Sequence, residues 1–229
     1  EKFKLLVIGI PKTGTVSVEN ALLLGLDRDG TCHGIHFGNT KFYSHQFKQG
    51  IVNHARAREF QDVLGPFYDS LTTIAFVRNP YAKLVSAYFF TKSLPIFKWQ
   101  KGKKKRIFRV LKYSLSVLAA RILPFKFWIY IYPYRSSTSY IASQDGDIIV
   151  EYIGRTENLE EDLNQFLEKS GIISKDVFLK VPKSNKSKHD HWANFYKNKA
   201  VLTKARKIMK EDILFYESRF GKINVTDFN

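Results

Sequence analysis

The sequence has little of several features, and each shortage excludes a kind of protein. Its 229 residues include one cysteine, Cys32, so no disulfide can form within the chain, and this favours a reducing compartment. No apolar signal segment opens the chain at Glu1. We therefore expect a cytoplasmic protein, which the basic insert described next could hold at a membrane surface. A Golgi location would require a membrane anchor upstream of Glu1.

Acidic residues are missing from a long central stretch. Between Ser70 and Gln144 there is no Asp or Glu but there are 14 Lys and Arg, eight of them from Lys98 to Lys112. Almost all of the net charge of +16 belongs to this stretch. Three interpretations of a basic insert at about 93–135 stay open: a solvated face, a docking surface for an anionic acceptor, or an amphipathic helix on anionic lipid. Nucleic acid is not predicted, because no recognition motif accompanies the charge.

Helical periodicity marks this insert. Apolar residues recur at helical spacing, and Leu123–Pro124 is expected to end the helix. Basic residues interrupt the apolar content too often for a membrane-spanning helix. An aromatic stretch follows from Phe125 to Tyr134. The periodic apolar positions are Ile107, Val110, Leu111, Leu115 and Leu118.

Apolar residues are plentiful. They make up 44% of the chain, with 19 Phe and 12 Tyr, which argues against disorder. A chain of this length can bury a full core. From the strand-to-helix junctions given next, we predict one α/β domain, residues 1–229, built as a three-layer sandwich with a central parallel sheet and a P-loop-like turn.

The start of the chain predicts a strand, a tight turn and a helix. The apolar run from Phe3 breaks at Ile10–Pro11 into Lys-Thr-Gly-Thr, and helical spacing resumes at Val16. This arrangement points backbone N–H groups at an anion, and Lys12 and three nearby hydroxyls add donors. In the usual nucleotide-triphosphate loop the lysine follows the second glycine, whereas here Lys12 precedes Gly14. An ordinary turn with a solvated lysine is the alternative.

A second strand-to-helix junction follows the same plan. Leu71–Val77 predicts a strand, and Pro80 suits the first turn of a helix, so Arg78 stands at the carboxyl end of the strand. Ser86 lies about two turns into that helix. Because ligands of parallel sheets bind outside the carboxyl strand ends, we expect Arg78 and Lys12 to share one crevice.

Four segments, in order along the chain, resemble motifs of the sulfotransferase superfamily. Residues 11–17 resemble the loop that binds the 5′-phosphosulfate, and residues 78–86 resemble the motif that binds the 3′-phosphate. Residues 152–163 and 185–189 resemble later motifs of the carbohydrate-modifying, membrane-type branch. The chain is similar in its compactness to bacterial-type members.

The resemblance implies an O-sulfotransferase that uses 3′-phosphoadenosine-5′-phosphosulfate (PAPS), releases 3′-phosphoadenosine-5′-phosphate (PAP) and needs no metal. The implied acceptor is a carbohydrate hydroxyl, with a small-molecule natural product as the alternative. A P-loop kinase and a catalytically silent glycan-binding module remain open, although Arg78 stands where a kinase would place an aspartate for Mg²⁺. The residues that the resemblance assigns to the cofactor are Pro11, Lys12, Thr13, Gly14, Thr15, Val16, Ser17, Arg78, Ser86, Arg155, Asn185, Lys186, Ser187 and Lys188.

Transfer to a hydroxyl requires a base, and histidine suits this role near neutral pH. The segment 30–37 predicts a short strand, and His36 is the closest match to the family's catalytic histidine. We therefore predict His36 and Lys12 as the catalytic pair. His33 is the runner-up and would face the other side of the strand. The next to test are His45 and His54.

The later chain predicts the rest of a nucleotide site. Asp147–Gly154 reads as a strand, and Asn158 is the expected N-cap of an acidic helix. Arg155 would bind the 3′-phosphate or form a salt bridge with Glu157 or Glu160. A polar loop at 183–188 would close over the cofactor. One structural helix is expected from about 199 to 219.

Overall fold

The computed structural model describes residues 5–26, 35–37, 54–96, 107–182 and 189–225. Its chain divides into two compact units. We call the first, Glu1–Asn79 with Arg135–Lys186, the sheet unit, and the second, Pro80–Tyr134 with Ser187–Asn229, the helical unit. The predicted insert at 93–135 is thus mostly part of a larger helical unit, which also holds the C-terminal helices. That the two units form one domain stays a prediction.

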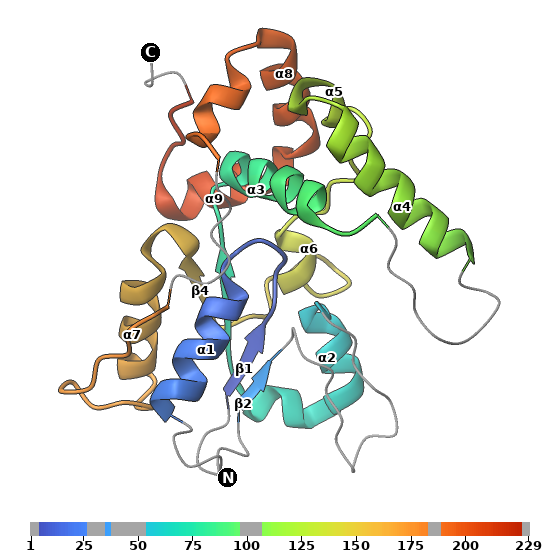
Figure 1. Cartoon of the computed structure of the whole chain (residues 1–229). Coiled ribbons are helices and arrows are strands. Elements are labelled where there is room, and N and C mark those ends of the chain that lie inside the picture. The colour runs from blue at the N-terminus through green and yellow to red at the C-terminus, as the bar shows by residue number, and fades with distance from the viewer. Residues whose placement is uncertain (1–4, 27–34, 38–53, 97–106, 183–188, 226–229) are drawn as a thin grey trace. The chain divides into compact units, whose positions relative to one another are not determined.

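The sheet unit contains a parallel sheet with strand order β2-β1-β3-β4 (Figure 1). In register, Leu6 of β1 lies between His36 of β2 and Thr73 of β3, and Ala75 pairs with Ile153 of β4. The α/β class with a central parallel sheet is therefore confirmed. The strands are β1 (Leu5–Ile8), β2 (Ile35–Phe37), β3 (Thr72–Val77) and β4 (Tyr152–Arg155).

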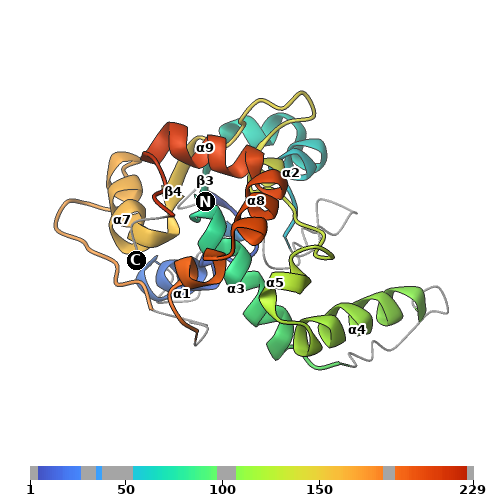
Figure 2. The ribbon, with the colours of Figure 1, turned by 90° about the horizontal axis from the view of Figure 1, so that it is seen from above.

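Helices cover the sheet, because its central strands are apolar on both faces. All four residues of β1 are buried, as are five of the six in β3, which is typical of a parallel sheet covered on both sides. Helices α1 and α7 pack their apolar residues against one face. Helix α2 lies on the other side of the sheet (Figures 1 and 2), an arrangement compatible with three layers. The helices of this unit are α1 (Thr15–Leu26), α2 (Ala57–Leu64), α6 (Thr138–Ile141) and α7 (Leu159–Lys169), with 3₁₀ turns η1 (Gly65–Ser70) and η3 (Thr156–Asn158).

The helical unit is organised around α3. Nine consecutive residues, Pro80–Tyr88, are buried, because α4, α5, α9 and a 3₁₀ turn all contact this helix. The core is largely aromatic: Trp128 packs against Tyr88 and stacks on Tyr132 with ring centroids 4.2 Å apart. As expected, the insert helix ends just before Leu123–Pro124. The elements are α3 (Pro80–Ser93), α4 (Ile107–Ile122), α5 (Phe125–Trp128), η4 (Trp192–Tyr196), α8 (Lys199–Ile208) and α9 (Lys210–Phe220).

Two predicted elements differ from the structure. The single C-terminal helix is wrong, because the chain bends at the buried Met209 (φ −108°, ψ 13°) and forms α8 and α9. The strand predicted from Asp147 pairs only from Tyr152 onwards. Before that point, Ile148 forms an antiparallel bridge with Ala142, and the N–H of Glu151 donates to the Thr73 hydroxyl. These contacts use backbone groups that a longer ladder would need.

None of the helices in the described part of the chain combines the length and the apolar character needed to cross a bilayer.

Candidate functional site

The loop between β1 and α1 has an unusual backbone. Lys12 and Gly14 have positive φ angles of 70° and 80°. Among the described residues other than glycine, Lys12 shares this left-handed conformation only with His54, whose φ is 59°. Such a conformation costs an L-residue roughly 1–2 kcal/mol. Strain of this kind gathers at functional sites, so its occurrence at Lys12 supports a role beyond that of a simple turn.

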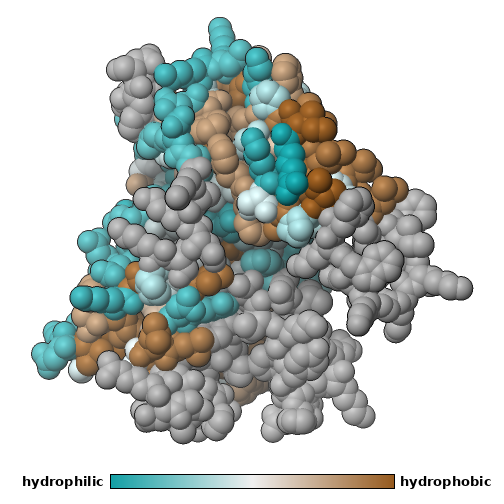
Figure 3. Space-filling view, viewed as in Figure 1, coloured by the Kyte–Doolittle hydropathy of each residue, from teal (hydrophilic) through white to brown (hydrophobic). Residues whose placement is uncertain are grey.

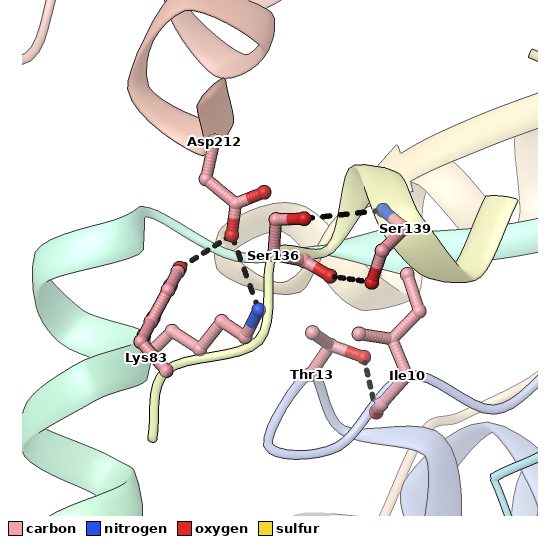
Figure 4. Close-up of polar contacts among 7 residues, drawn as sticks. Ile10, Thr13, Lys83, Ser136, Ser139 and Asp212 are labelled. Carbon is pink, nitrogen blue, oxygen red and sulfur yellow. Dashed lines mark hydrogen bonds and ion pairs between the residues drawn. The ribbon is translucent and has the colours of Figure 1, made fainter. Parts of the chain in front are cut away.

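The hydroxyls of the loop are used to hold it together. Thr13 and Thr15 are buried, and both donate to the carbonyl of Ile10, at 3.0 Å and 3.1 Å. Figure 4 shows the bond from Thr13. The helix then begins with Ser17 and Val18 donating from their N–H groups to the carbonyl of Gly14. In this arrangement the two threonine protons point at a carbonyl. To bind an anion, these hydroxyls would have to rotate.

Arg78 reaches the same loop from the end of β3. Its Nη1 donates to the carbonyl of Lys12 at 3.4 Å. Burial lowers the pKa of Lys12 to about 8, and the charge of Arg78 contributes to this lowering. Burial also lowers the pKa of Arg78, against the opposing effect of Glu157. Two cationic side chains are thus held together in a partly dehydrated place, as the sequence predicted for Lys12 and Arg78.

The segment after β4 connects these strand ends. The hydroxyl of Thr156 lies 2.9 Å from the carbonyls of both Thr13 and Val77. The backbone N–H of Asn79 donates to Oε1 of Glu157 at 2.9 Å. Sequence reasoning missed Thr156, although a hydroxyl residue directly after a strand was an available signal. The carboxyl ends of β1, β3 and β4 therefore form one connected structure.

Gly14 is required at its position for two reasons. Its φ of 80° disfavours any residue with a Cβ. A Cβ there would also lie 3.0 Å from Cδ2 of Leu159, the first residue of α7. The loop therefore sits tightly against the start of α7.

Arg155 forms a salt bridge within its own segment. Its Nε lies 3.3 Å from Oδ2 of Asp162 and its Nη2 lies 3.3 Å from Oδ1, while its backbone N–H donates to Oδ2 at 2.7 Å. The carboxylate lies further along the chain than the two partners that the sequence suggested, Glu157 and Glu160. The contact of Arg155 with a 3′-phosphate stays a prediction.

His54 lies against the strand end that leads into the loop. Its Nδ1 is 2.8 Å from the carbonyl of Gly9. A carbonyl only accepts hydrogen bonds, so Nδ1 of His54 carries the proton in this contact. In the neutral ring, Nε2 then has a free lone pair and can accept a proton. Sequence reasoning placed His54 behind His36 and His33 and level with His45, because nothing local ties it to a residue 45 positions earlier.

The remaining predicted residues are placed only in part. His36 is the middle residue of β2 and pairs with Leu6. Ser86 is buried on α3, in the helical unit, so its pairing with Arg78 on one phosphate stays a prediction. The predictions for His33, His45 and the loop at 183–188 fall outside the described residues. Within the described part of the chain, no three or more His, Cys, Asp or Glu gather as a metal site would require.

The helical unit contains a second polar cluster, which the sequence did not reveal. Lys83 of α3 and Asp212 of α9 form a buried ion pair, with 3.1 Å between Nζ and Oδ2 (Figure 4). The Tyr134 hydroxyl donates to the same Oδ2, and Lys83 Nζ lies 4.9 Å from the Tyr134 ring centroid. Burial lowers the pKa of Lys83. Burial also raises the pKa of Tyr134 well above its usual range, and the negative charge of Asp212 adds to this rise. Because each charge has a partner, we interpret this cluster as structural.

Comparison of the chain with protein-family models, curated protein sequences and solved structures found no match. Support for a function therefore comes from the motifs in the sequence and from the geometry of the loop.

Proposed function

We propose that the protein is a PAPS-dependent O-sulfotransferase whose donor site is the loop at residues 11–17 with Arg78. One observation carries the proposal: Arg78 at the end of β3 donates to the backbone of Lys12 at the end of β1. Two cations thus meet at the carboxyl ends of adjacent parallel strands, where such sheets bind ligands. The order of the motifs in the sequence supports the same assignment.

The residues of the loop suit an anionic ligand. The Arg78 charge lowers the pKa of Lys12, so the two side chains repel each other in the free protein. A 5′-phosphate beside Lys12 and a 3′-phosphate beside Arg78 would relieve this repulsion, and the anion beside Lys12 would stabilise its charged form. The α1 N-terminus adds the positive end of a helix dipole. We interpret the loop as the P-loop-like turn that the sequence predicted.

Each residue then has a defined task. PAPS supplies the sulfuryl group and departs as PAP. Lys12 and the N–H groups at the start of α1 stabilise the negative charge that develops on the leaving phosphate. Arg78 and Ser86 hold the 3′-phosphate and so orient the donor. The bond broken joins sulfur to the phosphate oxygen, the bond formed joins sulfur to the acceptor oxygen, and a histidine takes the hydroxyl proton.

Among the described residues, two histidines compete for the role of base. His36 is the residue that the family resemblance assigns. His54 is the histidine that contacts the backbone between β1 and α1, where its Nδ1 donates to the carbonyl of Gly9. This bond leaves Nε2 as the nitrogen that could accept a proton. We keep His36 as the predicted base and add His54 as the alternative that this contact favours. The acceptor remains a carbohydrate hydroxyl, with a small natural product as the alternative.

The experiment that tests the function is turnover of labelled PAPS with a panel of acceptors. The panel contains neutral and sulfated oligosaccharides, glycolipids and phenolic small molecules, and mass spectrometry identifies the products. We expect PAP and a sulfated acceptor to form without added metal. Transfer from ATP that requires Mg²⁺ would contradict the proposal in favour of a kinase. Glycan binding with neither PAP binding nor turnover would contradict it in favour of a binding module.

A further inference from the structure

Helix α4 is apolar on the face that points away from its own core. Leu111, Leu115, Leu118 and Ile122, which we call the outer stripe, recur every three or four residues and so form one line along the helix. Leu115 is 57% exposed and Ile122 is 67% exposed. A surface helix normally presents polar residues to solvent and buries its apolar stripe.

A different face of α4 packs into the helical unit. Val117 and Ala120 are fully buried and Ser114 is nearly so, at positions that lie between those of the outer stripe. The hydroxyl of Ser114 donates to the carbonyl of Ile96, and Arg121 donates to the carbonyls of Lys92 and Leu94. The helix is therefore anchored through its polar and small residues. The outer stripe takes no part in the buried core of its own unit.

The apolar surface continues from α4 onto α5 and the turn after it. Phe127, Tyr130 and Ile131 are each more than half exposed. Figure 3 shows hydrophobic surface gathered over the region of α4 and α5. Contiguous exposed apolar surface of this kind marks an interaction site more often than a random surface does.

Lysines border this surface. Lys112 and Lys126 are exposed beside it. An open hollow of about 620 Å³ adjoins it and is lined by Lys199, Lys204 and Lys207 of α8 together with Tyr130. Lys204 Nζ lies 5.4 Å from the centroid of the Tyr130 ring, so Tyr130 belongs to both the apolar surface and the hollow. In two views, α5 lies between α4 and α8 (Figures 1 and 2).

The charge of the chain belongs to the same unit. The sequence of the helical unit has 21 Lys and Arg against 5 Asp and Glu, a balance of +16. The sheet unit has 16 of each and is neutral. A second copy of this chain would bring like charges together at this surface. A nucleic acid would leave the outer stripe without an apolar partner.

We propose that the helical unit docks on an anionic lipid bilayer, with the outer stripe, Phe127 and Ile131 in the acyl boundary and the lysine hollow on lipid phosphates. An interfacial helix lies in the membrane plane with its apolar side in the lipid and its cations at the headgroups. The occupant follows from the charge, because anionic lipid attracts lysines, and from the apolar stripe that acyl chains would cover. Docking does not depend on the sulfuryl transfer proposed above.

The test is sedimentation of the full chain with vesicles, with no PAPS present. We expect binding to vesicles of 70% phosphatidylcholine and 30% phosphatidylserine, and this binding should weaken with NaCl. Binding to pure phosphatidylcholine should be slight. Because the assay contains no PAPS, a failure to bind vesicles would say nothing about the transferase. Leu115→Asn with Ile122→Asn should lower the partition coefficient at least about tenfold. Lys204→Gln with Lys207→Gln should lower it about fivefold for each lysine.

Matched controls lie on the sheet unit. Leu24→Asn with Phe178→Asn removes equally exposed apolar residues, and Lys175→Gln with Lys180→Gln removes exposed lysines. Both pairs should bind vesicles as the unchanged protein does. Circular dichroism verifies that every variant is folded. The proposal is overturned if the outer-stripe and control pairs lose binding equally or if neutral vesicles bind as tightly. It is also overturned if the outer-stripe pair instead disrupts a dimer, or if a single-stranded oligonucleotide binds this surface and vesicles do not.

Discussion

Arg78 donates from its guanidinium to the carbonyl of Lys12, across 66 positions of sequence, with 3.4 Å between Nη1 and the oxygen. This bond links the ends of β3 and β1, and it places a permanent positive charge beside a lysine whose pKa is already lowered by burial. Two adjacent, partly buried cations are the arrangement expected of an anion-binding site. Its consequences can be measured with PAP, the product of the proposed reaction, without knowledge of the acceptor.

The affinity for PAP should depend on pH through Lys12. The Lys12 pKa is about 8 in the free protein, and a bound anion should raise it toward the ordinary 10.5. Affinity is then fully present below pH 8 and falls as pH rises toward 10.5, by up to about tenfold for each pH unit. Calorimetric titration from pH 7 upwards measures this. Lys12→Arg should make the profile flat, whereas an equally steep profile in that variant would assign the titration to another group.

Loss of the lysine should abolish transfer without unfolding the protein. Lys12 is only partly buried, so Lys12→Ala removes little of the core. Removal of one charge-stabilising group typically costs about a hundred- to a thousandfold in rate. Single-turnover measurements with labelled PAPS should show this loss, and Lys175→Ala, on an exposed loop, should show none. Near-normal turnover in Lys12→Ala would mean that the loop is only a turn.

The strand-to-helix junctions could be predicted because their signals are local. The apolar run that breaks at Ile10–Pro11 marks the end of β1, and α3 begins at Pro80, as the preference of proline for the first helical turn suggests. The carboxyl ends of β1 and β3 then lie side by side because parallel strands share an edge. For this reason the amino-acid sequence alone could predict that Lys12 and Arg78 lie together.

Two features of the helical unit were predicted only in part, namely the break between α8 and α9 and the buried face of α4. The break between α8 and α9 had a signal, because Arg206 and Lys207 end one helix and Glu211 and Asp212 begin the next. The helical spacing of apolar residues correctly predicted α4, but this spacing does not show which face of the helix packs inward. The buried face is the one with Val117 and Ala120.

For the long-range contacts of polar side chains, no local signal identifies the partner. The hydrogen bond of His54 with Gly9 joins residues 45 positions apart, and the ion pair of Lys83 with Asp212 joins residues 129 positions apart. Each depends on how distant elements pack. A charged residue within the buried run of a helix, such as Lys83, indicates a buried partner without naming it.

The glycine of the loop offers a test in which backbone strain and ligand binding are separated. Gly14 and Gly146 both have positive φ, at 80° and 95°, so an alanine at either should cost roughly 1–2 kcal/mol of unfolding free energy. Only Gly14 has a side chain close to the added Cβ, that of Leu159 at 3.0 Å, whereas Gly146 has none within 4 Å. Denaturant titrations should show the greater loss for Gly14→Ala. PAP binding should fail in Gly14→Ala and persist in Gly146→Ala, and equal binding by both would contradict a role for the loop.

The two candidate bases are distinguished by comparing their alanine variants. A general base contributes about a hundred- to ten-thousandfold to the rate. His36→Ala should therefore lose at least the lower figure in turnover while binding PAP normally. If His54 is the base instead, His54→Ala shows that loss. His54→Asn keeps a donor for the Gly9 carbonyl. Compared with His54→Ala, it would restore the hydrogen bond to the backbone but not the rate of transfer. If neither variant slows transfer, a histidine base is excluded at both positions, and His33 and His45 are the next to change.

The most direct test of the central claim is calorimetry of PAP and adenosine 5′-phosphate with the unchanged protein and with Arg78→Ala, in the absence of Mg²⁺. A hydrogen bond to a charged group is worth about 1.5–3 kcal/mol, which corresponds to roughly ten- to a hundredfold in affinity. If Arg78 holds the 3′-phosphate, Arg78→Ala should lose that much for PAP and little for adenosine 5′-phosphate, which lacks that group. Equal losses for the two nucleotides, or no binding of PAP by the unchanged protein, would contradict the assignment of this loop to PAPS.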